Sequence, residues 1–233
     1  MKSAFVTGAR QGLGKGFADH LLDEGFMVFA GVHTKTDDMV DTEKLHWIEI
    51  DVTDDHSIER ASQQAANMTQ QIDLLINSAG VNKDTATNNH KEIVSNLSEL
   101  DRQTVLSMFD INSVSPMMVT QKFLKLLTGK PSFVINVSSC RASFHDKEGN
   151  DSGNYGYRAS KVALNMFTLC SLHDLPSNVK TFTVHPGNVR SKMNPTANMD
   201  PKEQARKIVA ITENWNNEHN GLFFNYDGTL YPL

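Results

Sequence analysis

Near its N-terminus the chain reads Thr7-Gly8-Ala9-Arg10-Gln11-Gly12-Leu13-Gly14, a glycine-rich stretch that decides the fold. The apolar run 4–6 precedes it, and residues 12–22 follow with apolar side chains at helical spacing, which predicts strand, tight turn and helix. Glycines at 8, 12 and 14 remove side chains where the backbone must turn and approach a pyrophosphate, and the following helix offers unpaired N–H groups. The stretch therefore predicts a dinucleotide site, although an ordinary strand-to-helix turn has the same local pattern.

Six further apolar runs have the character of strands: 26–30, 47–50, 72–76, 133–137, 179–184 and 222–224. They alternate with helical segments, one of which we expect Thr53 to cap. The alternation predicts an α/β fold, a doubly wound Rossmann-type parallel sheet of about seven strands with helices on both faces, in a three-layer sandwich. In such sheets the functional loops follow the carboxyl ends of the strands. Five residues of interest fall there: Gly8, Asp51, Asn77, Ser139 and Gly187.

The composition indicates one large domain, residues 1–233. Hydrophobic residues make up 39% and charged residues 21% of the chain, enough apolar content for a substantial core. No linker rich in proline, glycine or serine, no low-complexity tract and no repeat divides the sequence. We therefore expect a single NAD(P)-binding Rossmann-fold domain.

The charge pattern argues against a nucleic-acid surface. The formal net charge is -5 and the sequence contains no run of lysine or arginine, so we expect small-molecule partners and no nucleic acid. The apolar run 4–6 near the start is far too brief for a signal-peptide core or a membrane span. We expect a cytoplasmic protein with no membrane partner.

Cysteine and histidine usage gives no sign of a disulfide or a metal site. Cys140 and Cys170 form no C-x-x-C pair, and we expect both to be buried packing residues. The nine histidines are scattered without the spacing of metal ligands, so no metal is predicted.

A second motif, Tyr157-Arg158-Ala159-Ser160-Lys161, lies far downstream. A tyrosine and a lysine four residues apart share one face of a helix, so the ammonium of Lys161 should favour the phenolate of Tyr157. We expect this to lower the pKa of Tyr157 from ~10 toward working pH, which suits acid–base chemistry. Read singly, Tyr157 is equally a core or interface aromatic and Lys161 a solvated helix residue.

The choice between NADP(H) and NAD(H) depends on the end of the second strand. An NAD site usually has an acidic residue there, and this chain has Val32. Four basic side chains are within plausible reach of a 2'-phosphate: Arg10, Lys15, His33 and Lys35. We therefore favour NADP(H), while Asp37 and Asp38 keep NAD(H) open because loop geometry could return either one to the ribose.

Taken together, these motifs resemble the short-chain dehydrogenase/reductase family over essentially the whole chain. The segment 7–14 is similar to its T-G-x-x-x-G-x-G turn, 51–52 to its adenine-contacting pair, and 77–80 to its N-N-A-G element with serine in second place. Tyr157 and Lys161 match its Y-x-x-x-K, Pro186-Gly187 its nicotinamide-side turn, and Ser191 stands where threonine is usual. Segments 158–166, 185–190 and 226–232 are most similar to the C-factor and sniffer-like carbonyl reductase group.

The resemblance implies hydride transfer between nicotinamide and a carbonyl or alcohol, with Tyr157 exchanging the proton. Its implied catalytic residues are Asn112, Ser139, Tyr157 and Lys161, and Ser139 is chosen over Ser138 because the family motif places the catalytic hydroxyl second. The residues expected to bind the cofactor, by resemblance and by the charge argument above, are Gly8, Arg10, Gln11, Gly12, Leu13, Gly14, His33, Asp51, Val52, Asn77, Ala79, Gly80, Tyr157, Lys161, Pro186, Gly187, Val189 and Ser191. A homodimer or homotetramer is implied only by the resemblance.

Pro116 adds a hypothesis about Asn112. Proline has no N–H, so in a continuous helix the Asn112 carbonyl loses its i+4 partner and can hold a water of the proton path that the family match implies. The alternative is that Pro116 occupies the first turn of a new helix.

We expect the loops 141–156 and 192–200 to flank the substrate. In the second loop, the flexible side chains of Met193 and Met199 could adapt to the shape of a ligand or could equally be core contacts. The expected activity is that of an NADPH-dependent carbonyl reductase or alcohol dehydrogenase. A C-factor-like signalling or cofactor-sensing protein with little turnover is the main alternative, and a racemase or dehydratase on the same scaffold is a weaker one.

Overall fold

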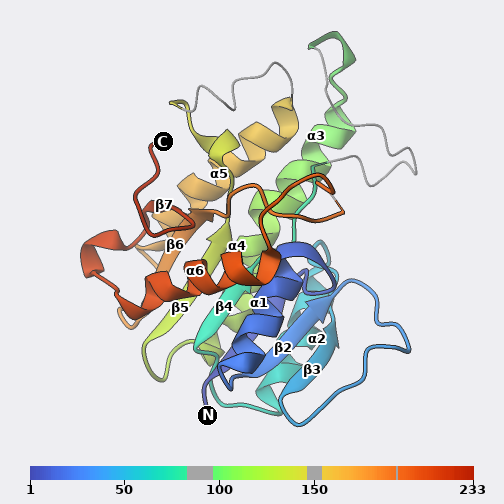
Figure 1. The fold of residues 1–233 in the computed structure, drawn as a ribbon, viewed down its shortest axis with the longest axis vertical. Helices are drawn as coiled ribbons and strands as arrows, with labels where there is room; N and C mark the ends of the chain where they lie inside the picture. The colour runs from blue at the N-terminus through green and yellow to red at the C-terminus, as the bar shows by residue number, and fades with distance from the viewer. Residues whose placement is uncertain (83–96, 146–153, 193) are drawn as a thin grey trace.

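Seven strands form a parallel sheet with the order β3-β2-β1-β4-β5-β6-β7 (Figure 1). The computed structural model describes residues 1–82, 97–145, 154–192 and 194–233. The strands are β1 (Ser3–Thr7), β2 (Met27–Val32), β3 (Leu45–Glu49), β4 (Leu74–Asn77), β5 (Ser132–Val137), β6 (Val179–His185) and β7 (Phe223–Asn225). The order reverses between β1 and β4, so the loops after these two strands diverge and leave a crevice at the carboxyl edge.

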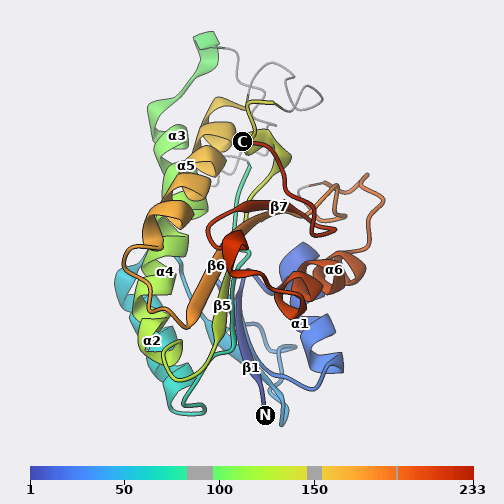
Figure 2. The same ribbon diagram turned by 90° about the vertical axis from the view of Figure 1, so that its left-hand side faces the viewer.

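Helices cover both faces of the sheet, as the edge-on view in Figure 2 shows. Helices α1 (Gly12–Asp23) and α6 (Pro201–Glu213) lie on one face, and α2 (Asp55–Ala66), α4 (Ser115–Phe123) and α5 (Tyr155–Ser171) lie on the other. The shorter helical turns are η1 (Leu97–Glu99), η3 (Leu124–Leu126), η4 (Cys140–Ala142) and η5 (Asn217–His219). The predicted three-layer α/β fold is confirmed.

Each face of the sheet has its own apolar core, because alternate residues of a buried strand point to opposite faces. On β1, Val6 packs in the cluster beneath α1 and α6, whereas Phe5 packs in the cluster beneath α2 and α4. Phe5 meets the ring of Phe123 on α4 with 4.4 Å between centroids. The two cores fix the sheet between the helical layers and so hold its carboxyl edge in place.

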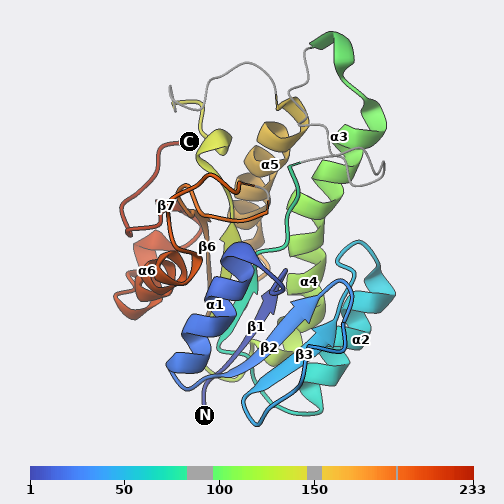
Figure 3. The same ribbon diagram turned by 45° about the vertical axis from the view of Figure 1, so that its right-hand side comes forward.

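One long helical segment crosses the edge of the site. Helix α3 (Arg102–Phe109) continues through the π-helical turn η2 (Asp110–Val114) into α4, visible as one green helix in Figure 3. The extra residue of a π-turn is a common feature of functional sites. Pro116 lies in the first turn of α4, but α4 continues the preceding helix, and the predicted water on the Asn112 carbonyl remains a prediction.

Strand and helix positions agree with the periodicity of the sequence to within a few residues, with one correction at a helix start. Asp54, not Thr53, is the N-cap of α2, and its carboxylate accepts the His56 N–H at 2.9 Å. Thr53 instead donates its hydroxyl to Asp51 at 2.7 Å. Among the residues that the structure describes, no helix is both long and apolar enough to cross a membrane.

Candidate active site

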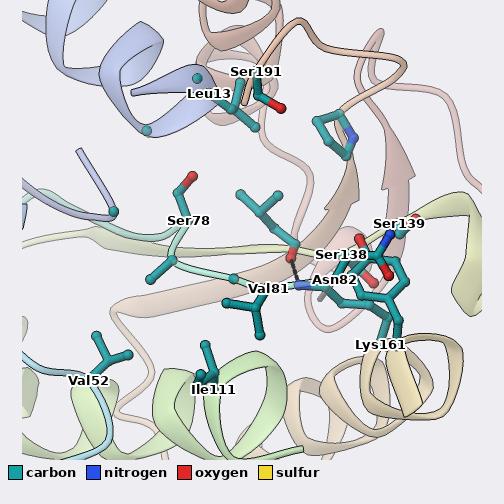
Figure 4. Close-up of a pocket in the computed structure, with 18 of the residues that line it drawn as sticks. Leu13, Val52, Ser78, Val81, Asn82, Ile111, Ser138, Ser139, Lys161 and Ser191 are labelled. Atoms are coloured by element: carbon teal, nitrogen blue, oxygen red, sulfur yellow. Dashed lines mark hydrogen bonds between the residues drawn. The ribbon is translucent and has the colours of Figure 1, made fainter. Parts of the chain in front are cut away.

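A cavity of about 1620 Å³ opens at the carboxyl edge of the sheet. The glycine-rich turn, the loop after β4, the end of β5, α5 and the segment after β6 form its walls (Figure 4). Eighteen of the predicted residues line the cavity: Gly8, Arg10, Gln11, Gly12, Leu13, Gly14, His33, Asp51, Val52, Ala79, Gly80, Ser139, Tyr157, Lys161, Pro186, Gly187, Val189 and Ser191. Of the predicted site residues, Asn77 and Asn112 are not part of its lining.

The glycine-rich turn brings the start of α1 to the cavity. In this described part of the chain no side chain caps α1, since Gln11 makes no capping bond and the first turn has no acidic residue. The N–H groups of that turn therefore face the cavity as anion binders. Gly14 is required by close packing, because a Cβ there would overlap the carbonyl oxygen of Gly8.

Thr7 ties this turn to the loop after β4. Its hydroxyl oxygen accepts the N–H groups of Ser78 at 3.0 Å and Ala79 at 3.1 Å. The next residue, Gly80, leaves room for two polar side chains, since a Cβ there would lie 3.2 Å from Asn112 Oδ1 and 3.6 Å from Lys161 Nζ. The two loops of the crevice are thus held in one geometry.

Asp51 anchors the other end of the cavity. Its carboxylate accepts the N–H and hydroxyl of Thr53 and lies 3.5 Å from His33 Nε2. Burial alone would raise the pKa of Asp51, but the bonds from Thr53 and the interaction with His33 hold it below its ordinary value. Asp51 is therefore ionised at neutral pH and is an acceptor in the cavity wall.

The basic residues expected near a 2'-phosphate divide into two groups. Arg10 and His33 line the cavity. Lys15 and Lys35 do not, and they pair instead with Asp19 and with Asp41, the latter at 3.7 Å. The side chains of Asp37 and Asp38 are also outside the lining, although the charge of Arg10 lowers the pKa of Asp38 after the stronger effect of its bond with Thr36.

Ser139, Tyr157 and Lys161 meet at the opposite end. Ser139 follows β5, hydrogen-bonds with the phenol of Tyr157 and accepts the Arg141 N–H at 3.2 Å, so it also caps η4. Lys161 donates to the Val137 carbonyl at 2.7 Å, a bond visible in Figure 4. Two hydroxyls and a buried amine therefore converge at the end of β5.

The expected lowering of the Tyr157 pKa is wrong. Burial raises the pKa of Tyr157 above its ordinary value, and the bond from Ser139 and the charge of Arg141 oppose that rise only in part. Burial also lowers the pKa of Lys161 from 10.5 to about 7, so its ammonium is only partly populated at neutral pH. Lys161 Nζ lies 5.9 Å from the Tyr157 ring centre, so the two side chains share a helix face as expected. The expected direction of the pKa was wrong because the four-residue spacing does not reveal that both groups are removed from water.

Asn112 holds the site together from behind. Its side chain is fully buried, with Oδ1 accepting the Val81 N–H and Nδ2 donating to the Val81 carbonyl, both at 2.8 Å. Nδ2 also donates to the Ser160 hydroxyl at 3.0 Å. One amide therefore links η2, the loop after β4 and α5, next to both Tyr157 and Lys161.

Asn77 is placed differently from the prediction. Its Nδ2 donates to Asn136 Oδ1 at 2.8 Å and to Thr120 and the Pro116 carbonyl at 3.3 Å, so the side chain joins β4, β5 and α4 beneath the cavity. Because β4 residues alternate between faces, the side chain before Ser78 points into the helical layer. It is a structural amide and is not a cavity residue.

The segment after β6 closes over the glycine-rich turn. Ser191 lies near Gly12, since a Cβ at Gly12 would be 3.0 Å from the Ser191 Cβ. Gln204 on α6 donates to the Pro186 carbonyl at 2.8 Å and fixes the start of the segment. Met199 packs beside Gly187 and is not part of the cavity lining. Met193 and half of the predicted loop 141–156, residues 146–153, lie outside the described residues.

The cysteines are not the buried packing residues that we expected. Cys140 is half-buried and lines the cavity next to Ser139, and Cys170 is exposed on α5. The two cysteines form no disulfide among the described residues. The positions that the structure describes contain no group of three or more metal-ligating side chains.

Other lining residues were missed by sequence reasoning. Some are direct neighbours of motifs and could have been found by proximity: Val81, Asn82, Ser138, His185 and Asn188. Others come from α3 and η2, which have no motif, and only the tertiary packing of that long helix brings them to the cavity: Gln103, Leu106, Ser107, Asp110 and Ile111.

Comparisons with known proteins agree with this geometry. A family model described as short chain dehydrogenase matches residues 2–202. The C-signal of Myxococcus xanthus is 34% identical over 167 residues, which cover 70% of this chain and 94% of that protein. Carbonyl reductase Sniffer of D. melanogaster superposes with a TM-score of 0.86 at 26% identity, with all of both chains covered. NADPH-bound carbonyl reductase from chicken fatty liver shares the fold, with a TM-score of 0.88, 24% identity, and coverage of 100% of this chain and 99% of that one.

Proposed function

Since the chain belongs to the short-chain dehydrogenase family and is an oxidoreductase, we propose that it is an NADPH-dependent carbonyl reductase or alcohol dehydrogenase. Its substrates in this proposal are small or medium-sized carbonyl compounds or the matching alcohols. The similarity to carbonyl reductase Sniffer supports this substrate class.

The residues of the cavity fit a nicotinamide dinucleotide. The uncapped start of α1 and the close-packed glycine turn provide an anion cradle between the Asp51 end and the Tyr157 end. At the Asp51 end, where a 2'-phosphate of NADP(H) would bind, Arg10 supplies positive charge and His33 supplies an imidazole. Val32 stands where an NAD site usually has an acidic residue. His33 must exchange its contact with Asp51 for the phosphate.

The bound nicotinamide would supply or accept a hydride. Reduction builds negative charge on the substrate oxygen, so Tyr157 donates a proton there and Ser139 donates a hydrogen bond. A raised pKa keeps the Tyr157 phenol protonated and ready to donate in the reductive direction. Lys161, with a pKa of about 7, takes up and releases protons at neutral pH beside it.

Asn112 positions these groups and has no contact with the cavity. By fixing both backbone polar groups of Val81 and the hydroxyl of Ser160, it sets the distance between the loop after β4 and α5. In this proposal, the carbonyl of Asn112 holds the water that returns protons to Lys161.

The single observation that carries the proposal is the convergence of Ser139, Tyr157 and Lys161 in one cavity with the glycine-rich turn. A panel of carbonyls and alcohols, assayed in both directions with NADPH and NADH, tests substrate class, direction and coenzyme together. Consumption of NADPH with aldehydes or ketones supports the proposal. Catalysis of isomerisation or water loss without stoichiometric NADPH consumption would replace it.

A second candidate is a signalling or cofactor-sensing role, favoured by the 34% identity with C-signal. An experiment in cells can distinguish the sensing role from the catalytic role. A Tyr157→Phe variant that binds NADPH and restores the complete biological phenotype of a deletion strain would favour sensing. Loss of the phenotype together with turnover would favour chemistry.

We propose a homodimer or homotetramer as the working assembly. Apolar side chains on the outer face of α5 support this, since Met166, Phe167 and Leu169 are 57%, 41% and 43% exposed. Light scattering of the purified protein measures the assembly state directly.

A further inference from the structure

Arg141 is a charged residue at the reactive end of the cavity, and the proposed chemistry gives it no contact with a ligand. It lies two residues after Ser139, in the helical turn η4, and lines the cavity. The backbone of this turn is fixed, because the Arg141 N–H donates to Ser139 Oγ at 3.2 Å and the next residue, Ala142, is fully buried. The arginine side chain therefore starts beside the serine that hydrogen-bonds with the Tyr157 phenol.

The guanidinium of Arg141 also lies close to this phenol. Burial raises the pKa of Tyr157, and the bond from Ser139 and then the positive charge of Arg141 lower it. Water and dissolved salt screen a charge within about 10 Å, so a guanidinium that pointed out into solvent would have little effect on a buried phenol. The half-buried Arg141 side chain therefore turns toward the reactive end of the cavity.

The charged side chains of the cavity divide between its two ends. Among the lining residues that the structure describes, the carboxylates are Asp51 and Asp110. Burial and then the charge of Asp51 raise the pKa of Asp110, so both carboxylates belong to the Asp51 end. In the described part of the wall, the opposite end therefore has the basic residues Arg141 and Lys161 and no carboxylate.

Of these two basic residues, Arg141 is the one suited to bind an anion. Lys161 Nζ donates to the Val137 carbonyl at 2.7 Å, and burial lowers the pKa of Lys161 from 10.5 to about 7. A guanidinium stays charged at every pH at which enzymes work, and its planar fork of N–H groups can bind a carboxylate through two parallel bonds. It has five donors, so it can do this and keep another contact.

The size of the charge favours a carboxylate over a phosphate at this position. One guanidinium balances the single negative charge of a carboxylate and matches its two oxygens. A phosphate monoester has between about 1.5 and 2 negative charges at neutral pH and three acceptor oxygens, which one arginine does not satisfy.

We propose that Arg141 binds a carboxylate of the substrate and makes oxo acids, carbonyl compounds that also contain a carboxylate, the preferred substrates. The inference rests on the proposed reductase function. In the reaction the carbonyl carbon receives a hydride, its oxygen receives the Tyr157 proton, and NADPH is oxidised to NADP⁺. The product is a hydroxy acid, and the carboxylate is unchanged.

The test compares 2-, 3- and 4-formylbenzoate with their methyl esters as substrates for NADPH-dependent reduction. The rigid ring sets a different separation between carboxylate and aldehyde in each isomer, and the ester removes the charge with little change in shape. In the wild type, kcat/KM for at least one formylbenzoate should exceed that for its ester by about tenfold to a hundredfold, because the ester loses the charge-assisted bonds.

Arg141→Met should bring this acid-to-ester ratio to within about threefold of one. Loss of the positive charge also changes Tyr157, but that change affects acid and ester alike and cancels in the ratio. Arg141→Lys keeps the charge without the planar fork, so its ratio should lie between those of the wild type and Arg141→Met. Circular dichroism checks that both variants are folded.

Arg190 provides the matched control. Its side chain is 58% exposed, pairs with Asp200 at 3.5 Å and is not among the cavity-lining residues. Arg190→Met removes the same charge from the protein and should leave the acid-to-ester ratio unchanged. A ratio that falls as far in Arg190→Met as in Arg141→Met would overturn the subsite and show a general effect of net charge.

Binding of the formylbenzoates to the NADP⁺ complex, measured by calorimetry, separates the subsite from the proposed function. Reduction of every ester at least as efficiently as its acid, or a preference for the acid that Arg141→Met retains, refutes the subsite and leaves the reductase intact. Formylbenzoate binding that Arg141→Met loses, without NADPH consumption by the wild type, refutes the reductase and retains the subsite. Absence of binding and turnover for all acids and esters overturns both.

Discussion

Replacing Lys161 with methionine should stabilise the protein, by an amount that decreases as the pH rises. Lys161 is 5% exposed, and burial lowers its pKa from 10.5 to about 7. This lowering corresponds to about 5 kcal/mol that opposes folding below pH 7, where the ammonium is charged in both the folded and the unfolded chain. Between pH 7 and pH 10.5 the folded protein loses the proton first, so this opposition fades.

The loss of one hydrogen bond offsets part of the gain. Lys161→Met removes the bond to the Val137 carbonyl, which is worth about 1–3 kcal/mol for a charged donor. The variant should therefore be more stable than the wild type by about 2–4 kcal/mol at pH 6. Its advantage should decrease by about 1.4 kcal/mol for each pH unit between 7 and 10.

Urea unfolding, followed by circular dichroism at pH 6, 7, 8 and 9, measures this difference. Lys125→Met on the exposed side of η3 is the control and should show no pH-dependent change relative to the wild type. A Lys161→Met advantage that is constant across this range, or a variant less stable than the wild type at pH 6, would refute the reasoning. It would show that the amine is solvated in the folded protein.

Three further changes test other parts of the structure. Arg10→Ala should raise the Kd for NADPH by about tenfold to a hundredfold and leave the Kd for NADH within about threefold, as measured by fluorescence titration; equal weakening of both would place the arginine elsewhere. Asn112→Ala breaks the three hydrogen bonds of this side chain to Val81 and Ser160. The free energy of unfolding, measured by urea titration, should fall by about 3–5 kcal/mol. A loss below about 1 kcal/mol would contradict the positioning role. Gly14→Ala places a Cβ on a backbone oxygen of the glycine-rich turn, so NADPH binding and thermal stability should both fall, and a variant with an unchanged melting temperature would show that the turn is not close-packed.

Most of the fold follows from local sequence pattern. The parallel strands are continuous apolar runs, the helices between them have amphipathic spacing, and glycines separate the two, so periodicity alone predicts the order of elements. The sequence gives the wrong residue where two neighbouring residues can make the same hydrogen bond. Thr53 and Asp54 can both cap α2, and the strand that ends before Asp51 draws Thr53 to the Asp51 carboxylate and leaves the cap to Asp54.

The site was predictable wherever a motif residue follows a strand. Parallel strands end at one edge, so Gly8, Ala79, Ser139 and Gly187 lie around one cavity although they are far apart in sequence. Asn77 differs because it is the last residue of β4 and points into the helical layer. Because side chains alternate along a strand, a shift of one residue decides whether a side chain points into the cavity or into the core.

Electrostatics of the site was the least predictable part. The spacing of Tyr157 and Lys161 indicates a shared helix face, but their pKa values depend on how much water the surrounding helices exclude. The surroundings of the buried Ser138 hydroxyl, which has no hydrogen-bond partner among the described residues, depend on the same tertiary packing. No local pattern contains this information, because it arises from segments that are distant in sequence.

The central claim is that Tyr157 delivers the proton while a substrate carbonyl receives a hydride in the cavity beside Ser139 and Lys161. The most direct measurement is single-turnover reduction of a ketone with NADPH that carries deuterium at both C4 positions, in the wild type and in Tyr157→Phe. We predict deuterium on the carbinol carbon in the wild type, and a rate at least about a hundredfold lower in the variant with NADPH affinity retained. Equal rates in the two proteins, or a product without deuterium, would contradict the account.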